Sequence, residues 1–308
     1  MDRGPVLVYD RLDVFTEKIF SGNPLAIVHL NPSKTISAAE KLLIAKEFNL
    51  AETVFLHAPL PTSFVFPIDI FDTLEELPFA GHPTIGAGWY LLQRYPEMET
   101  VTLRTKAGDI PVYKAEDHPA AVHLRIPVDF KCHGLHPHLE LKAAQRFLDA
   151  GDYKNGRDAS EPIASIVKGM TFILIELVSE EALAKVVPHS KRSEVSRDIV
   201  GDWYGFTAIY FYVILPDGKV RTRMFDGPVE DPATGSAAST LASYLAVKRG
   251  VPGIQNFDIV QGVEMGRRSA IAVSVDVSSD GEVMEVDLAG SAVMVMNGRI
   301  EGIGRCDR

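Results

Sequence analysis

Two helical segments with almost no charge constrain the fold of this chain more than any other feature. Residues 85–92 read IGAGWYLL, and residues 235–246 read GSAASTLASYLA. A helix that is small or apolar on every face is buried and does not lie on a surface. Strand-like segments surround both helices, so we expect each half of the chain to wrap a curved sheet around one central helix.

The same short motif precedes both of these helices. Residues 82–87 read HPTIGA, and residues 231–237 read DPATGSA. Each motif places a titratable residue before a proline, with a glycine and a small residue four and five positions further on. Proline suits the first turn of a helix, and a helix start attracts anions. The motifs therefore predict two half-sites that face one small anionic ligand.

The fold class follows from the order of the remaining elements. Helices are predicted at 37–48, 82–92, 138–150, 180–187 and 232–249, the first with an N-cap at Ser37 and a capping box through Glu40. Apolar or alternating runs predict strands at 6–9, 12–15, 25–28, 53–56, 64–71, 101–104, 122–126, 172–177, 208–215, 271–277, 283–288 and 292–296. This order favours an α+β duplication over an alternating βαβ fold.

The domain boundary is expected near Pro127–His133, after the strand at 122–126. The first domain then comprises residues 1–127 and the second residues 128–291. The last strand, at about 292–308, is expected to return to the first domain.

Composition excludes several classes of protein. The net charge is −10 and no basic stripe is present, which argues against a nucleic-acid partner. No apolar stretch approaches the ~20 residues of a membrane helix, and Met1–Pro5 do not begin a signal peptide. Cys132 and Cys306 form no disulfide framework, so two free thiols in a reducing compartment are expected. These features favour a cytoplasmic protein.

Glu52 and His82 are the first candidates for chemistry. Glu52 lies between a helix end and an apolar strand, where burial can make a carboxyl proton transferable near neutral pH. The alternative is an ordinary surface glutamate. His82 begins a helix, where an imidazole can move a proton or attract a carboxylate. The alternative is a structural cap.

Asp231 is the third candidate, and it also fits the role of a simple N-cap. Thr84 and Ser236 are either small helix-packing residues or ligands of a carboxylate. In the second case their hydroxyls would act together with the backbone amides of Gly81 and Gly235.

Other chemistries lack their sequence marks. The chain contains no phosphate loop, no Gly-x-Gly-x-x-Gly before a helix and no Gly-x-Ser-x-Gly. His133, His136 and His138 are close in sequence but lack further obvious ligands, so no metal site is predicted. Acid–base chemistry on a small carboxylate, without a cofactor, is the class that remains.

The chain resembles the phenazine biosynthesis PhzF-like proteins, which are relatives of diaminopimelate epimerase in fold. The motifs that carry the resemblance are DVFT (13–16), SGNPLA (21–26), NLAET (49–53), ELPFAGHPT (76–84), EDPATGSAA (230–238), QG (261–262) and MGR (265–267). They occur in the family's order and cover nearly the whole chain.

The resemblance implies two similar domains, each a twisted, mostly antiparallel or mixed sheet around a central helix, with the ligand in the cleft between them. It also implies cofactor-free isomerisation by proton transfer, with Glu52 as the acid and base. His82, Asp231 and Ser236 would position the substrate and relay protons, and the Gly81 and Gly235 amides would meet its oxygens. A homodimer is a further expectation.

One departure from the wider superfamily separates two chemistries. Related racemases use a cysteine on each central helix as a pair of thiols, whereas both helix starts lack a thiol here. A hydroxyl cannot replace a thiol of pKa ~8.5 in that role, so a two-cysteine racemase is disfavoured. The alternative from another class is a non-catalytic binding or interaction protein that keeps the fold and the pocket.

Overall fold

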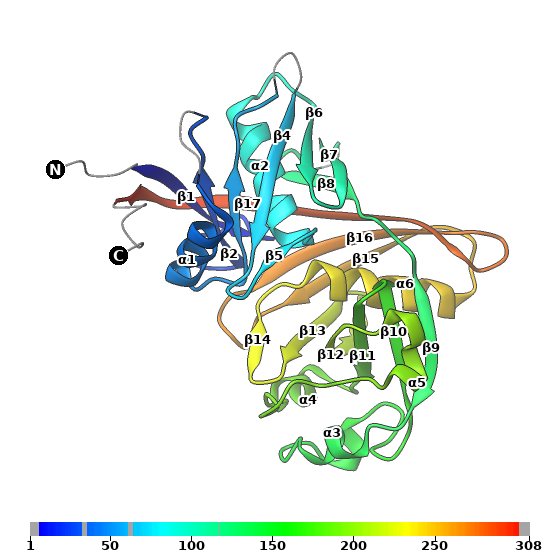
Figure 1. The fold of residues 1–308 in the computed structure, drawn as a ribbon. Helices are drawn as coiled ribbons and strands as arrows, with labels where there is room; N and C mark the ends of the chain where they lie inside the picture. The colour runs from blue at the N-terminus through cyan, green and yellow to red at the C-terminus, as the bar shows by residue number, and fades with distance from the viewer. Residues whose placement is uncertain (1–5, 33–35, 61–63, 117, 302–308) are drawn as a thin grey trace. The chain divides into compact units, whose positions relative to one another are not determined.

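The computed structural model describes residues 6–32, 36–60, 64–116 and 118–301 (Figure 1). Cys306 and Met1–Pro5, on which the sequence carries expectations, lie outside the described residues. The chain divides into two compact units. Unit 1 comprises Met1–Arg125 and Ala289–Arg308, and unit 2 comprises Ile126–Leu288. Both units combine mixed sheets with few helices.

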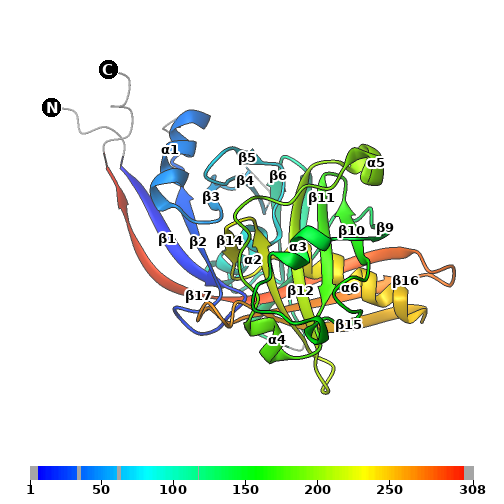
Figure 2. The same cartoon turned by 90° about the horizontal axis from the view of Figure 1, so that it is seen from below.

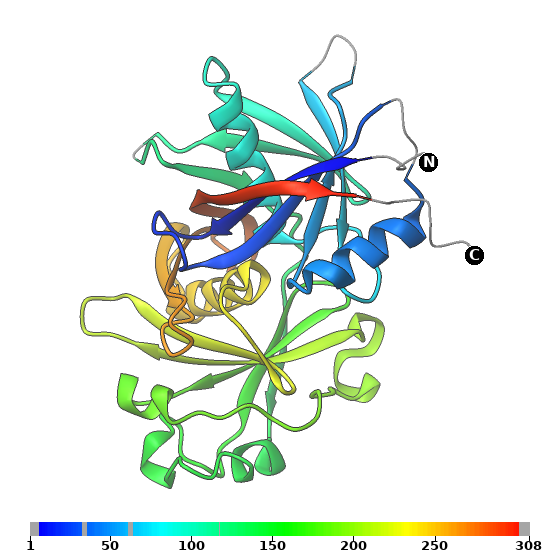
Figure 3. The same ribbon diagram turned by 90° about the vertical axis from the view of Figure 1, so that its left-hand side faces the viewer.

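Unit 1 is built on a mixed sheet. Strand β1 pairs antiparallel with β2 and β17, while β2 and β3, and likewise β4 and β6, are parallel neighbours. The blue β1 and the red β17 run side by side (Figure 2 and Figure 3). Strand β8 also pairs with β17, so the sheet closes on itself. The elements are β1 (Leu7–Val14), β2 (Asn23–His29), α1 (Ala38–Phe48), β3 (Thr53–Leu56), β4 (Val65–Phe71), β5 (Glu76–Leu77), α2 (Gly81–Arg94), β6 (Thr100–Thr105), β7 (Gly108–Lys114), β8 (Ala121–Arg125) and β17 (Val283–Ile300), which begins in unit 2.

Unit 2 is also built on a mixed sheet, in which β11 and β12, and likewise β13 and β15, are parallel neighbours. The other pairs, β9 with β10, β10 with β11, β12 with β13, β13 with β14 and β15 with β16, are antiparallel. The elements are β9 (Lys131–His136), α3 (Leu139–Ala143), β10 (Glu161–Val167), β11 (Met170–Glu176), α4 (Glu180–Ala184), α5 (Arg197–Val200), β12 (Phe206–Ile214), β13 (Val220–Asp226), β14 (Val229–Asp231), α6 (Gly235–Arg249), β15 (Gly253–Gln261) and β16 (Ser269–Val277), with short 3₁₀ turns at Ala150–Asp152 and Gly201–Trp203.

The two units repeat one local topology. In unit 1, β4 pairs with the short β5, the chain enters α2, and β6 then returns parallel to β4. In unit 2, β13 pairs with the short β14, the chain enters α6, and β15 returns parallel to β13. Each of the two motif helices therefore connects two parallel neighbouring strands of its own unit.

Both motif helices are buried, as their composition predicted. Nine of the fourteen residues of α2 and ten of the fifteen residues of α6 are buried. Helix α2 contacts β1, β2, β3, β6, β7 and β8, and α6 contacts β10, β11, β15 and β16. Glycine allows the close approach of α2, because a Cβ at Gly88 would lie 2.5 Å from a Val112 methyl group.

Two pairs of predicted strands are confirmed as strand, but each pair forms one long strand. The runs at 6–9 and 12–15 belong to β1, whose register against β17 shifts between Arg11 and Leu12. The runs at 283–288 and 292–296 belong to β17. A Cβ at Gly290 would lie 2.4 Å from the Phe15 ring, so this glycine accommodates a close contact and does not end the strand.

The helix predictions succeed best where a local cap defines the end. Ser37 and Glu40 form the predicted capping box of α1. The helix expected at 138–150 is wrong, because α3 ends at Ala143 and the Gln145 amide then bonds to both backbone groups of Val187. In the part of the chain that the structure covers, no helix has the length and apolar character needed to cross a membrane.

Candidate active site

Glu52 and His82 are in direct contact within unit 1. The Glu52 Oε2 atom lies 2.8 Å from His82 Nδ1. Glu52 belongs to the short connection that follows α1, whose C-cap Asn49 is left-handed with φ 50°, and that leads into β3. Its side chain is 21% exposed and that of His82 is 4% exposed. The sequence prediction that Glu52 lies between a helix end and a strand is confirmed.

His82 has one ring nitrogen without a partner. Its Nε2 is buried and accepts or donates no hydrogen bond among the described residues. A buried polar atom of this kind is rare in folded proteins and calls for an explanation. Because Nδ1 is engaged with Glu52, Nε2 is the atom through which this imidazole would meet a ligand.

The start of α2 lacks a side-chain cap. The N-cap Ala80 supplies no acceptor, and the first turn contains no acidic residue. The first backbone N–H groups of the helix therefore receive no side-chain acceptor of the usual kind. Thr84 is fully buried and its hydroxyl donates to the Ala80 carbonyl at 2.6 Å, which is the contact of a helix-packing residue.

Asp231 ends β14 in unit 2 and does not cap α6. The N-cap is Thr234, which makes no capping hydrogen bond, and its hydroxyl instead donates to Asp231 Oδ2 at 2.5 Å. The expectation that Pro232 begins the helix is wrong, because the chain stays non-helical until Gly235. Helix α6 therefore also starts without a side-chain cap and with no acidic residue in its first turn.

The two helix starts correspond in a way that the motifs did not predict. Gly81 and Gly235 are the first residues of their helices, and His82 and Ser236 are the second. The sequence comparison paired His82 with Asp231, which lies four residues before its helix. By helix position, the partner of His82 is Ser236, which is partly exposed.

The predicted site residues thus form two groups, one in each unit. Glu52, Gly81, His82 and Thr84 gather at the start of α2, while Asp231, Gly235 and Ser236 gather at the start of α6. That both groups meet one ligand stays a prediction. Sequence analysis assigned no role to Thr234, or to Gln261, which it noted only within a family motif.

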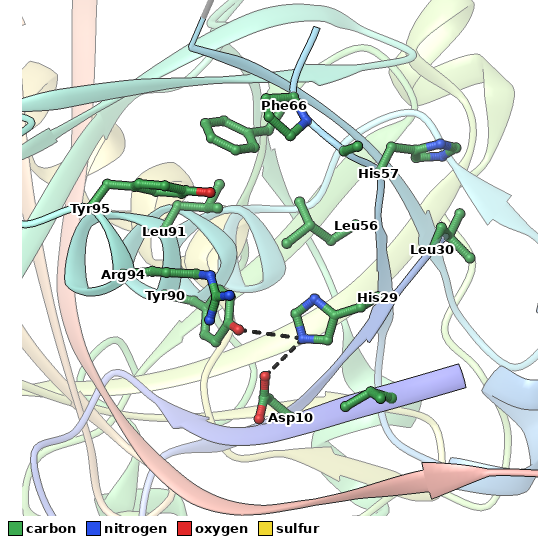
Figure 4. Close-up of a pocket in the computed structure, with 13 residues that line it drawn as sticks. Asp10, His29, Leu30, Leu56, His57, Phe66, Tyr90, Leu91, Arg94 and Tyr95 are labelled. Atoms are coloured by element: carbon green, nitrogen blue, oxygen red, sulfur yellow. Dashed lines mark hydrogen bonds and ion pairs between the residues drawn. The ribbon is translucent and has the colours of Figure 1, made fainter. Parts of the chain in front are cut away.

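Unit 1 also contains a separate pocket of about 320 Å³ (Figure 4). Helix α2 contributes Tyr90 and Arg94 to it, which lie about 12 Å and about 18 Å along the helix from His82. His29 Nε2 lies 2.8 Å from Asp10 Oδ2 and 3.4 Å from the Tyr90 hydroxyl. Burial, together with Asp10, raises the pKa of Tyr90 to about 12. The pocket includes neither Glu52 nor His82.

Two of the three clustered histidines of unit 2 make ordinary hydrogen bonds, while Nε2 of the third, His138, is buried and has no partner among the described residues. His133 Nε2 lies 2.9 Å from the Ser165 hydroxyl, and His136 Nε2 lies 2.9 Å from the His133 carbonyl. His138 is the N-cap residue of α3. Across the described residues, no group of three or more His, Cys, Asp or Glu side chains is arranged to hold a metal ion.

The fold and sequence match one family along almost the whole chain. The profile of the phenazine biosynthesis-like proteins (PhzC-PhzF) matches residues 12–298, and the chain belongs to this family. An uncharacterised isomerase of Pasteurella multocida is 34% identical over 276 residues, which cover 88% of this chain and 87% of that protein.

One further relative and one solved structure are also similar to the chain. The trans-2,3-dihydro-3-hydroxyanthranilate isomerase of Pseudomonas aeruginosa is 28% identical over 296 residues, 94% of this chain and 98% of its own. A Bacillus anthracis phenazine biosynthesis protein of the PhzF family has a similar fold, with a TM-score of 0.78 at 22% identity, and the match covers 96% of this chain and 99% of that one. By its relatives, the chain is an isomerase.

Proposed function

We propose that this chain moves a proton between two carbons of a small carboxylate-bearing substrate, without a cofactor, and that Glu52 is the acid and base. The observation that carries the proposal is the Glu52–His82 contact of 2.8 Å at the uncapped start of a buried helix. The proposed site is completed by Asp231 and Ser236, and the ligand binds between two domains that each wrap a sheet around a central helix. Two observations support this part of the proposal, which goes beyond the Glu52–His82 contact. They are the resemblance of the motifs to those of the family and the equivalent starts of α2 and α6.

The proton transfer requires one group to change protonation state twice. Glu52, ionised at the outset, removes a proton from one carbon, and the electron pair of that C–H bond shifts into the unsaturated system of the substrate. Glu52 then returns the proton to a different carbon, so atoms and charge balance without an oxidant or metal. While Glu52 is ionised, His82 Nδ1–H donates to Oε2, and Nε2 of the neutral ring is an acceptor.

The substrate carboxylate is proposed to meet the helix starts. The backbone N–H groups of Gly81 and Gly235 occupy the first position of helices that lack a side-chain cap. Such positions favour anions through unpaired donors and through the helix dipole, which is worth typically ~0.3–1 kcal/mol for an exposed charge. Where the substrate carboxylate is conjugated with the carbon that loses its proton, it also helps to stabilise the electron pair that the C–H bond releases.

The first compound to test is trans-2,3-dihydro-3-hydroxyanthranilate, on which the Pseudomonas aeruginosa relative acts by name. It is a cyclic, unsaturated carboxylate and so belongs to the proposed substrate class. The measurement is its isomerisation in D₂O, followed by NMR. We expect deuterium at the carbon that receives the proton, to the extent that the Glu52 proton exchanges with solvent during turnover.

Replacing Glu52 with Gln keeps the size of the side chain and removes the base. We expect turnover to fall by about 10³-fold or more, with ligand binding almost unchanged. Glu47→Gln removes an exposed carboxylate from the neighbouring helix α1 and serves as the matched control. Full activity of Glu52→Gln removes Glu52 from the mechanism. Binding without isomerisation or exchange in the native chain favours the alternative of a non-catalytic binding protein.

A further inference from the structure

We infer that Thr234 and Gln261 are positioning residues that hold Asp231 in place and present a hydrogen-bond donor to its carboxylate. The inference rests on the proposed function, in which Asp231 belongs to the site. It concerns only unit 2 and a group of side chains that has no assigned role. None of these residues is proposed to touch the reacting atoms.

Gln261, the last residue of β15, connects both ends of the loop that precedes α6. Its side chain is fully buried. The amide nitrogen Nε2 lies 2.8 Å from the Asp231 carbonyl oxygen and 3.0 Å from Thr234 Oγ1. The amide oxygen Oε1 lies 3.3 Å from the Thr234 backbone nitrogen and 2.9 Å from the Tyr210 hydroxyl. One side chain therefore bonds to the backbone at the first and last residues of the loop.

These contacts fix which atom donates in every bond. A backbone carbonyl can only accept and a backbone N–H can only donate, so the Gln261 amide has one possible orientation. Its Nε2 then donates to Thr234 Oγ1, which leaves the single hydroxyl hydrogen of Thr234 for Asp231 Oδ2, 2.5 Å away. Thr234 is thus a fixed donor to the carboxylate, and a donor of this kind favours the ionised form.

Tyr210 supports the amide from the opposite side. Its hydroxyl lies 2.9 Å from Gln261 Oε1 and 2.9 Å from Thr222 Oγ1. Thr222 is directly opposite Gln261 in the parallel β13–β15 pair. Burial raises the pKa of Tyr210, so its hydroxyl remains protonated and able to donate. A buried network in which each partner is satisfied has little freedom to rearrange.

The loop backbone is held at a further point. The Ser269 hydroxyl donates to the Pro232 carbonyl at 2.8 Å. Gly262 follows Gln261 with φ +73°, and a Cβ there would lie 2.6 Å from the same carbonyl oxygen. Only glycine allows the end of β15 to pass so close to the loop. The residues that hold Asp231 are therefore buried on the side of the loop that packs against β15.

The test is a pH titration of the Asp231 carboxyl in the full chain, followed by its ¹³Cγ resonance and assigned with Asp231→Asn. We expect Thr234→Val, which keeps the shape and removes the donor, to move the midpoint to higher pH. Thr234→Ser retains the hydroxyl and restores it. Thr240→Val is the matched control, because Thr240 is also a buried threonine, in α6, and its hydroxyl donates to the Ser236 carbonyl. An unchanged midpoint in Thr234→Val overturns the inference.

Kinetics on trans-2,3-dihydro-3-hydroxyanthranilate provide the second readout. We expect Thr234→Val and Gln261→Met to lower kcat by about 10- to 100-fold, the range for one hydrogen bond to a charged group, with KM nearly constant. If Asp231→Asn loses activity while Thr234→Val and Gln261→Met keep full activity, the positioning role is refuted and the role of Asp231 is not. Full activity in Asp231→Asn refutes the part of the proposed function that includes Asp231. If the native chain does not turn over this compound, the titration alone decides the inference.

Discussion

His82 contacts Glu52 through Nδ1 at 2.8 Å, while its Nε2 is buried and has no hydrogen-bond partner in the part of the chain that the structure describes. The two nitrogens of one imidazole therefore have separate tasks. Nδ1 orients the carboxylate, and Nε2 is the atom available to a ligand.

Two substitutions of His82 separate these tasks. The amide nitrogen of Asn lies close to the position of Nδ1, whereas that of Gln lies close to Nε2. If the orientation of Glu52 matters more, His82→Asn retains activity better than His82→Gln, and we expect a difference of about tenfold or more in kcat, since one hydrogen bond to a charged group is lost. Steady-state kinetics on the relative's substrate measure it. Equal losses in both variants would contradict this division of roles.

His138 makes the stability of unit 2 depend on pH. Burial, with the positive charges of His136 and Lys142, lowers the pKa of His138 from 6.5 to about 4. The unfolded chain therefore binds a proton near pH 6.5 that the folded chain does not bind until about pH 4. This contribution to stability is complete above pH 6.5 and is lost as the pH falls from 6.5 to 4. The Nε2 atom of His138 is buried and has no hydrogen-bond partner among the described residues.

His138→Asn should reduce this dependence, because Asn is a good N-cap and does not titrate. Urea unfolding at pH 7 and pH 5 gives the free energy of unfolding under both conditions. We expect the native chain to lose more stability than the variant over this interval. His118→Asn is the control, since His118 is 56% exposed and pairs with the exposed Glu17. An identical loss in His138→Asn and the native chain would exclude His138 as the source.

The buried Lys142–Glu161 pair should be a strong determinant of stability. Their side chains are 1% and 0% exposed, and Lys142 Nζ lies 2.7 Å from Glu161 Oε1. The same ammonium donates to the carbonyls of Gly156 and Ala159. Lys142→Met would leave a buried carboxylate with Asn155 as its remaining donor among the described side chains, and we expect a loss of ~3–5 kcal/mol.

Urea denaturation of Lys142→Met tests this value. Lys185→Met breaks an exposed pair with Asp152 and should cost less than ~1 kcal/mol. Adding Glu161→Met to Lys142→Met removes the unpaired charge and should restore part of the stability. If the two lysine variants are equally stable, the buried pair does not contribute more to the free energy of unfolding than the exposed pair, and the prediction is wrong.

Gly88 should not tolerate alanine, although alanine is the better helix former. A Cβ at this position would lie 2.5 Å from a methyl group of Val112, and both residues are buried. Overpacking costs ~1–3 kcal/mol, more than the ~1 kcal/mol that alanine gains in a helix. Thermal unfolding of Gly88→Ala, Val112→Ala and the double variant gives the coupling.

We expect the double variant to lose less stability than the sum of the losses of the two single variants, because Val112→Ala makes room for the new methyl group. Gly151→Ala is the control, since a Cβ there would meet nothing within 4 Å. Additive losses in the double variant would show that the two side chains do not compete for space.

The local signals in the sequence predicted local structure well. The capping box at Ser37 and Glu40 forms as expected, and the uncharged composition of α2 and α6 correctly indicated burial. Strand β13 was not predicted, because Arg221 and Arg223 interrupt its apolar pattern. Arg223 is nevertheless buried, paired at 2.7 Å with Glu230, and the sequence contains no mark of that pairing.

In the candidate site, too, local features were predicted and contacts between distant residues were not. The residue types and the elements that bear Glu52 and His82 were predicted, and their contact is present. The start of α6 at Gly235 and not at Pro232 was not predicted, because the buried amide of Gln261, 27 residues after Thr234, holds the loop in a non-helical form. Contacts between distant residues of this kind have no local signature.

Strand β17 places the partner of β1 almost at the other end of the chain, with Leu7 opposite Ile300. All of unit 2 lies between the two segments of unit 1. During synthesis, the ribosome therefore releases every residue of unit 2 before the strand that completes unit 1 exists. Unit 2 can therefore fold before unit 1 is complete, although it is synthesised after the first segment of unit 1. Until β17 has been synthesised, β1 has one unpaired edge.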